Sequence, residues 1–254
     1  MAAPPRPPRS LLAQRHPGAV ALVAVAGVFL FGALAWAALS GASTTFDEVV
    51  LRMLRDPSSV GRLRGPALLA EAARDVTALG SHAVVMLVVV GVVGFLFLAN
   101  RPALALWVLA AGSGGMVLNQ VLKAIFARPR PQLVPWLVQV ESPSFPSGHA
   151  LLSSAFYLTI ALVIHEVTPQ RRLRVFAGAC AATLIALIGA SRVVLGVHYP
   201  TDVLAGWVAG ALWALVCAAV ARALVRRGTS EPDTAAPGLS EAAEDPPARA
   251  ARRR

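Results

Sequence analysis

The stretch SRVVLGVHYPTD, residues 191–202, is a short polar segment between two apolar runs that are each long enough to cross a lipid bilayer. It brings Arg192, His198 and Asp202 close together along the chain. Ionisable groups at the edge of a membrane cost several kcal/mol to keep dry and unpaired, so their default interpretation is a functional site. The segment therefore predicts a membrane protein whose function resides where its helices end.

The composition also indicates a membrane protein. Of the 254 residues, 56% are hydrophobic and only 14% are charged, and the mean hydropathy is positive, which is outside the range of an ordinary soluble domain. A span needs about 20 apolar residues. Six apolar runs predict an all-α, polytopic protein with six transmembrane helices, at 18–40, 82–99, 103–122, 150–167, 173–190 and 203–225. Apolar residues at helical spacing predict short extracytoplasmic helices between the first two spans.

The two ends of the chain differ from the middle. Residues 1–17 and 228–254 are rich in Pro, Ala and charged residues, so we expect a disordered arm and a disordered tail around one membrane domain, residues 18–227. The net charge of +10 would by itself fit a nucleic-acid partner. The arginines cluster beside the spans, however, so we expect no nucleic-acid partner. Positive charge beside spans marks the cytoplasmic side, which places both termini in the cytoplasm. The polar segments then face the extracytoplasmic side of the cell membrane.

Two further polar segments lie beside apolar runs. Lys123, the only lysine of the chain, is by itself an ordinary snorkelling cation at a span end, but Arg130 follows it with a guanidinium fork that can grip two phosphate oxygens. The tetrapeptide PSGH, residues 146–149, has the pattern of a turn that starts a helix, where free backbone N–H groups attract an anion. Ser147 also fits an ordinary N-cap.

His198 precedes Asp202 by four residues. A carboxylate at that spacing can accept the imidazole N–H, fix the tautomer and stabilise the imidazolium that forms when the ring attacks an electrophile. A purely structural His–Asp bond fits the pair equally well. We expect no metal, because a divalent cation would lie among several arginines.

In chain order the segments read Lys123-x6-Arg130-Pro131, Pro146-Ser147-Gly148-His149 and Ser191-Arg192-x5-His198-x3-Asp202. This pattern resembles the three-part signature of the type 2 phosphatidic acid phosphatase (PAP2) superfamily. The resemblance implies that His198 is the nucleophile and forms a phosphohistidine, that Asp202 orients it, and that His149 is the general acid. It also implies that no metal or other cofactor is needed and that the phosphate is held by Lys123, Arg130, Ser147, Gly148 and Arg192.

The expected function is that of a bacterial membrane lipid phosphatase, with undecaprenyl diphosphate as the best guess for the substrate and phosphatidylglycerol phosphate or phosphatidate next. A lipid phosphotransferase and a non-catalytic phospholipid-binding or transport protein are the alternatives. The signature is also similar to that of vanadate-dependent haloperoxidases, which are soluble. Because His198 must be neutral and His149 protonated, we expect a bell-shaped pH profile. Arg128 is expected to be auxiliary, and the oligomeric state stays open.

Overall fold

The computed structural model describes residues 17–228. They form eight helices and one hairpin, namely α1 (Pro17–Ser40), α2 (Thr44–Met53), β1 (Arg55–Asp56), β2 (Ser59–Leu63), α3 (Leu68–Ala78), α4 (His82–Leu98), α5 (Pro102–Phe126), α6 (Gly148–Val167), α7 (Arg171–Val194) and α8 (Pro200–Gly228). The predicted all-α membrane architecture is thus confirmed. The predicted disordered arm and tail lie outside the described residues, except for Pro17 and Gly228, which are the ends of α1 and α8.

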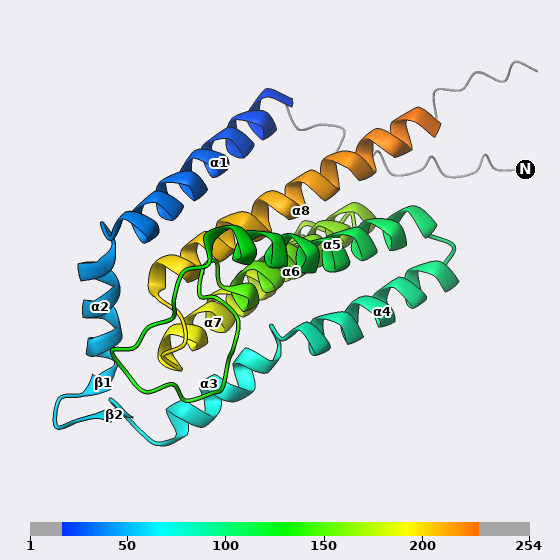
Figure 1. The fold of residues 1–254 in the computed structure, drawn as a ribbon. Helices are drawn as coiled ribbons and strands as arrows, with labels where there is room; N and C mark the ends of the chain where they lie inside the picture. Colours follow the sequence, from blue (N-terminus) through cyan, green and yellow to red (C-terminus); the bar gives the residue numbers. More distant parts are fainter. Residues whose placement is uncertain (1–16, 229–254) are drawn as a thin grey trace, which may run out of the picture.

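The long helices run side by side, with α6 in the middle of the bundle (Figure 1). Helix α6 contacts α4, α5, α7 and α8, and half of its most apolar window is buried, compared with 6% for α1. The main core lies where α4, α5, α6 and α8 meet, and it includes Val89, Trp107, Phe156 and Ala218. An enclosed α6 gives its first residues a fixed position.

Five helices are long and apolar enough to cross a membrane: α1, α5, α6, α7 and α8. Helix α4 has 17 residues and meets the same test only together with α3, from which a 43° bend separates it. The structure therefore contains five spans, or six if the bent pair is one span, against the predicted six. Helices α5 and α7 continue four residues past the predicted ends, so Lys123 and Arg192 lie in last helical turns.

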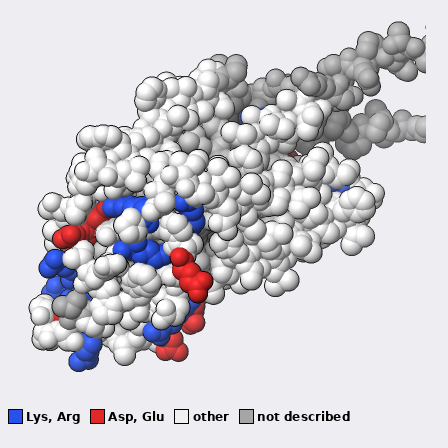
Figure 2. All heavy atoms as spheres, viewed as in Figure 1, with Lys and Arg blue, Asp and Glu red and all other residues white. Residues whose placement is uncertain are grey.

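The longer connections gather at one end of the bundle, which we call the polar end. Here lie α2, the β1–β2 hairpin, α3 and the segment 127–147 (Figure 1). Lys, Arg, Asp and Glu side chains concentrate at the same end in the space-filling view, whereas the rest of the visible described face is almost free of charge (Figure 2). The hairpin, with strands of two and five residues, was not predicted, because strands this short leave little periodic signal.

Close packing of α8 against α6 fixes the start of α6. A Cβ added at Gly206 would lie 2.7 Å from the Ser147 carbonyl oxygen, and one added at Gly210 would lie 2.7 Å from the Ser154 Cβ. Small residues let two helices approach in this way. The backbone N–H of Ser147 also donates to the Asp202 carbonyl, at 2.9 Å, so the PSGH tetrapeptide lies directly beside the first turn of α8.

Candidate active site

The three polar segments meet at the polar end of the bundle. The last turns of α5 and α7 supply one cation each, the start of α6 supplies the PSGH residues, and the α7–α8 connection and first turn of α8 supply the His–Asp pair. All eight predicted residues are buried except His149, which is partly buried: Lys123, Arg130, Ser147, Gly148, His149, Arg192, His198 and Asp202. The structure thus brings the whole predicted set to one end of the molecule.

Helix α5 ends just beyond Lys123. Ala127 adopts a left-handed conformation with φ 44°, and Pro129 and Pro131 follow, so the helix cannot continue. Lys123 Nζ donates to the Pro143 carbonyl oxygen. This bond ties the last turn of α5 to the segment that leads into α6.

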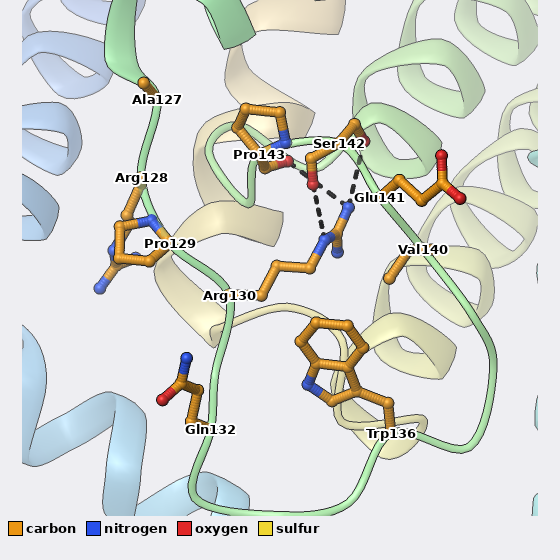
Figure 3. Close-up of a pocket in the computed structure, with 10 residues that line it drawn as sticks. All are labelled: Ala127, Arg128, Pro129, Arg130, Gln132, Trp136, Val140, Glu141, Ser142 and Pro143. Atoms are coloured by element: carbon orange, nitrogen blue, oxygen red, sulfur yellow. Dashed lines mark hydrogen bonds between the residues drawn. The ribbon is translucent and has the colours of Figure 1, made fainter.

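Arg130 lies between that segment and His198. Its Nε donates to the Ser142 carbonyl at 2.7 Å, and its Nη1 donates to the Val197 carbonyl at 2.6 Å and lies 3.2 Å from His198 Nε2. In the close-up, the Arg130 side chain points toward Ser142 and Pro143 (Figure 3). Burial lowers the pKa of Arg130 to about 10, so the guanidinium stays charged at neutral pH.

The His–Asp pair is joined through a third side chain. His198 Nδ1 lies 3.5 Å from Asp202 Oδ2 and 3.4 Å from Ser144 Oγ. Ser144 Oγ donates to Asp202 Oδ2 at 2.5 Å, and the Tyr199 N–H donates to the same oxygen at 2.9 Å. Burial, then Arg130 and Arg192, lower the pKa of His198 well below its usual value of 6.5. The imidazole is therefore neutral at physiological pH, with Nδ1 on the carboxylate side and Nε2 on the arginine side.

Arg128 holds the other oxygen of Asp202. Its Nη1 donates to Asp202 Oδ1 at 2.6 Å, its Nη2 donates to Asp47 Oδ2 at 3.0 Å, and the guanidinium carbon lies 4.2 Å from the centre of the Tyr199 ring. Burial alone would lower the pKa of Arg128, but Asp202 and then Asp47 outweigh it and raise the pKa. Arg128 is thus a central link and more than the auxiliary residue that the sequence predicted.

Three buried polar side chains near the start of α6 have atoms without a hydrogen-bond partner among residues 17–228. They are Ser147 Oγ, Arg192 Nε and both polar atoms of the Asn119 amide. Ser147 occupies the N-cap position but its hydroxyl makes no capping bond, and Arg192 uses Nη1 to donate to Thr77 Oγ1 at 2.9 Å. Asn119 lies so close to Gly148 that a Cβ there would be 3.0 Å from its Oδ1. These donors, together with the N–H groups that open α6, suit an anion.

Sequence reasoning missed Asp47, Ser144 and Asn119. Ser144 and Asn119 lie near motif residues, three residues before Ser147 and four before Lys123, so proximity to the motifs was an available signal. Asp47 had none, because a carboxylate on an amphipathic surface helix is usually solvated. In the structure it is fully buried.

Arg130 is one of the residues that line a pocket of about 280 Å³. Ten residues line it, including Gln132, Trp136, Glu141 and Ser142 (Figure 3). Within the described part of the chain, no three His, Cys, Asp or Glu side chains are grouped as metal ligands would be.

Comparisons with known proteins identify the family. Residues 102–226 match the PAP2 superfamily, and this matched range contains every predicted site residue. The phosphatidylglycerophosphatase B of Bacillus subtilis is 34% identical over 57% of this chain and 71% of its own length. The lipid A 1-phosphatase of Rhizobium etli is 32% identical over 69% of this chain and 82% of its own length.

A solved structure has the same fold. The crystal structure of a transmembrane PAP2 type phosphatidylglycerolphosphate phosphatase from Bacillus subtilis superposes with a TM-score of 0.68 at 28% identity, covering 79% of this chain and 96% of that chain. The bundle therefore has the fold of a membrane PAP2 phosphatase. The chain belongs to the PAP2 superfamily and is a membrane-bound hydrolase of phosphoric monoesters.

Proposed function

We propose that this enzyme removes the phosphate of a membrane lipid on the extracytoplasmic face, through a phosphohistidine on His198. The observation that carries the proposal is the asymmetry around the His198 ring. Nδ1 faces Asp202 and Ser144, and Nε2 lies beside the Arg130 guanidinium at 3.2 Å. A ring that keeps its proton on the carboxylate side offers the lone pair of Nε2 to an electrophile.

In the first step, His198 Nε2 attacks the phosphorus atom and the P–O bond to the lipid breaks. His149, in the first turn of α6, donates a proton to the leaving oxygen. Asp202 stabilises the positive charge that develops on the imidazole. Lys123, Arg130 and Arg192, with Ser147 and the N–H of Gly148, hold the phosphate oxygens, because phosphoryl transfer depends mainly on positioning and on cations around the oxygens.

In the second step, water attacks the phosphohistidine and the P–N bond breaks. His149, now neutral, accepts the proton of the attacking water, and inorganic phosphate leaves. Both histidines return to their starting protonation states. The cations of the chain supply the charge stabilisation at each step, so we propose that turnover needs no metal ion.

Similarity guides the choice of substrate. Relatives matched over two thirds or more of their own length are named as a phosphatidylglycerophosphatase B, lipid A 1-phosphatases and decaprenylphosphoryl-5-phosphoribose phosphatases, and these names indicate lipid phosphomonoesters as substrates. An undecaprenyl-diphosphatase from Sulfolobus acidocaldarius is 36% identical, but over only 44% of its own length. We therefore propose a lipid phosphomonoester, with phosphatidylglycerol phosphate first, ahead of our sequence-based choice of undecaprenyl diphosphate.

The test measures phosphate release by the purified protein in detergent with EDTA. The substrates are phosphatidylglycerol phosphate, phosphatidate and undecaprenyl diphosphate, and the proteins are wild type, His198→Ala and the control His165→Ala, which alters a histidine in the last turn of α6 at the opposite end of that helix. We expect release by wild type and control, and a loss on the order of 10⁴-fold or more in His198→Ala. Release that requires a divalent cation, or that survives in His198→Ala, would contradict the mechanism.

A further inference from the structure

We propose that Asp47, on helix α2, is a positioning residue of this reaction, which holds the Asp202 carboxylate against His198 through Arg128 and the first turn of α8. The inference rests on the proposed role of His198 as nucleophile. Asp47 lies outside all three motifs and outside residues 102–226, the range that matches the family.

Asp47 is fully buried and every oxygen of its carboxylate is used. Oδ1 accepts from the Thr201 N–H at 3.0 Å. Oδ2 accepts from Arg128 Nη2 at 3.0 Å, from Thr201 Oγ1 at 2.7 Å and from Ser43 Oγ at 2.9 Å. Two of these donors belong to Thr201, the residue before Asp202, so Asp47 fixes the turn that carries the partner of His198.

Arg128 links Asp47 to Asp202. Its two terminal nitrogens each bind one carboxylate, Nη2 that of Asp47 and Nη1 that of Asp202. A planar guanidinium that is bound at both ends has one orientation available. Arg128 Nη1 therefore holds Asp202 Oδ1 at 2.6 Å, while Asp202 Oδ2 stays beside Ser144 and His198. Without Asp47, the Arg128 side chain could rotate about its bonds with Asp202 and carry the carboxylate with it.

Charge gives a second reason for Asp47. The cluster around His198 contains Arg128, Arg130, Arg192 and Lys123 as cations and Asp202 as the directly contacting anion. With Asp202 alone, Arg128 would draw the full negative charge toward Oδ1, away from the imidazole. A second carboxylate on Arg128 leaves more of the Asp202 charge available to the imidazolium that forms during phosphoryl transfer.

The experiment compares Asp47→Asn with Glu48→Gln, a matched control that neutralises the next carboxylate of the same helix. Among residues 17–228, Glu48 forms its one ion pair with the exposed Arg52, at 3.6 Å. We measure kcat and KM for phosphatidylglycerol phosphate, together with thermal unfolding, for wild type, both variants and His198→Ala. We expect Asp47→Asn to lower kcat on the order of 10- to 100-fold, the range found when an outer hydrogen-bond partner of a metal-ligating side chain is removed. KM should stay within about twofold, because Asp47 does not contact the phosphate. Glu48→Gln should match wild type.

A double-mutant cycle separates positioning from general loosening of the fold. Ser144→Ala also weakens the hold on Asp202, without contacting Asp47. If both residues act through Asp202, the double variant loses less kcat than the product of the two single losses. Should Asp47→Asn not fold, Thr201→Val removes the hydroxyl between Asp47 and Arg128 while keeping both charges, and we expect a drop in kcat of about 3- to 10-fold at unchanged KM.

A folded Asp47→Asn variant with wild-type kcat would overturn the proposal, and so would one in which only KM changes. The proposal would also fail if the loss of kcat in the Asp47→Asn/Ser144→Ala double variant equalled the product of the two single losses. The measurement on His198→Ala distinguishes failure of the Asp47 proposal from failure of the proposed function. If wild type is active and His198→Ala is not, an unchanged Asp47→Asn rejects only the role of Asp47. If wild type releases no phosphate, both proposals are rejected.

Discussion

The two sides of His198 are built differently. On the Asp202 side, all four oxygens of Asp47 and Asp202 accept hydrogen bonds from Arg128, Ser144 and neighbouring groups. On the Gly148 side, Ser147, Asn119 and Arg192 each keep polar atoms without a partner among the described residues. Folding has fixed the side that would orient His198 as the proposed nucleophile, and the Gly148 side keeps polar atoms of Ser147, Asn119 and Arg192 available for the phosphate. Preorganised dipoles of this kind cost no reorganisation during the reaction.

Breaking the Asp202 side at its centre should have the largest effect. Arg128→Gln leaves two fully buried carboxylates without their cation, and removing one partner of a buried ion pair costs about 3 to 5 kcal/mol. We expect a large drop in the temperature of unfolding, measured in detergent, together with loss of phosphatase activity. Arg52→Gln is the control, because its pair with Glu48 is solvent-exposed and such pairs contribute about 0 to 1 kcal/mol. Equal effects of the two changes would mean that the Asp202 side is not held by Arg128.

A smaller change on the same side concerns Ser144. Ser144→Ala removes the hydroxyl between Asp202 Oδ2 and His198 Nδ1, while Arg128 and the Tyr199 N–H still hold the carboxylate. We expect kcat to fall on the order of 10-fold or more with little change in stability. Ser142→Ala, in the same segment, removes only an acceptor of Arg130 at 3.2 Å. A larger loss of kcat in Ser142→Ala than in Ser144→Ala would reverse our assignment of the two serines.

The sequence predicted that Lys123, Gly148 and Arg192 lie at one end of the bundle, because helix geometry decides their position. Lys123, Gly148 and Arg192 lie in first or last turns, so apolar run lengths place them at one end of a bundle once the direction of each span is known. The family resemblance then identified them as one set. Their catalytic and binding roles are untested and stay predictions.

On the Asp202 side, the role of Asp47 could not be predicted, because its contacts cross long sequence separations. Asp47 meets Arg128 and Thr201 across 81 and 154 residues, and no periodicity encodes such a pairing. The β1–β2 hairpin has the same difficulty. Its Arg55 side chain is buried by donating to the carbonyl of Val194, 139 residues away, and a charged residue in a short connection otherwise predicts solvent exposure.

The Gly148 side can be tested through Asn119. Its buried amide has no hydrogen-bond partner among residues 17–228, so it should lower stability and be available for binding. Asn119→Leu replaces it with an apolar group of similar size, so we expect the ligand-free protein to gain about 1 to 3 kcal/mol. The same change should lower kcat/KM about 10-fold if the amide contacts the phosphate or its N–H neighbours. Gln120→Leu is the control, since Gln120 is exposed on the same helix. A variant that is both less stable and fully active would show that Asn119 belongs to the helix packing alone.

The smallest expected effect concerns the charge around His198 itself. Burial and then Arg130, Arg192 and Lys123 lower its pKa well below 6.5, and Ser144 and Asp202 face the ring from the other side. Because His198, as the proposed nucleophile, must be neutral, kcat/KM should stay high as the pH falls through 6.5 and decline only near the lower pKa of the folded state.

Thermal stability should behave in the opposite way over the same pH interval. The unfolded chain protonates this histidine near 6.5 while the folded chain does not, so the unfolded state binds more protons and the contribution of His198 to stability falls as the pH is lowered. Arg130→Gln sharpens the test by removing the nearest cation, 3.2 Å from Nε2. The pKa of His198 should then rise, and the acid limb of kcat/KM should move to higher pH even though the maximal rate is lower. An acid limb at or above pH 6.5 in wild type, or one that does not move in Arg130→Gln, would mean that a group other than His198 controls the rate on the acid side.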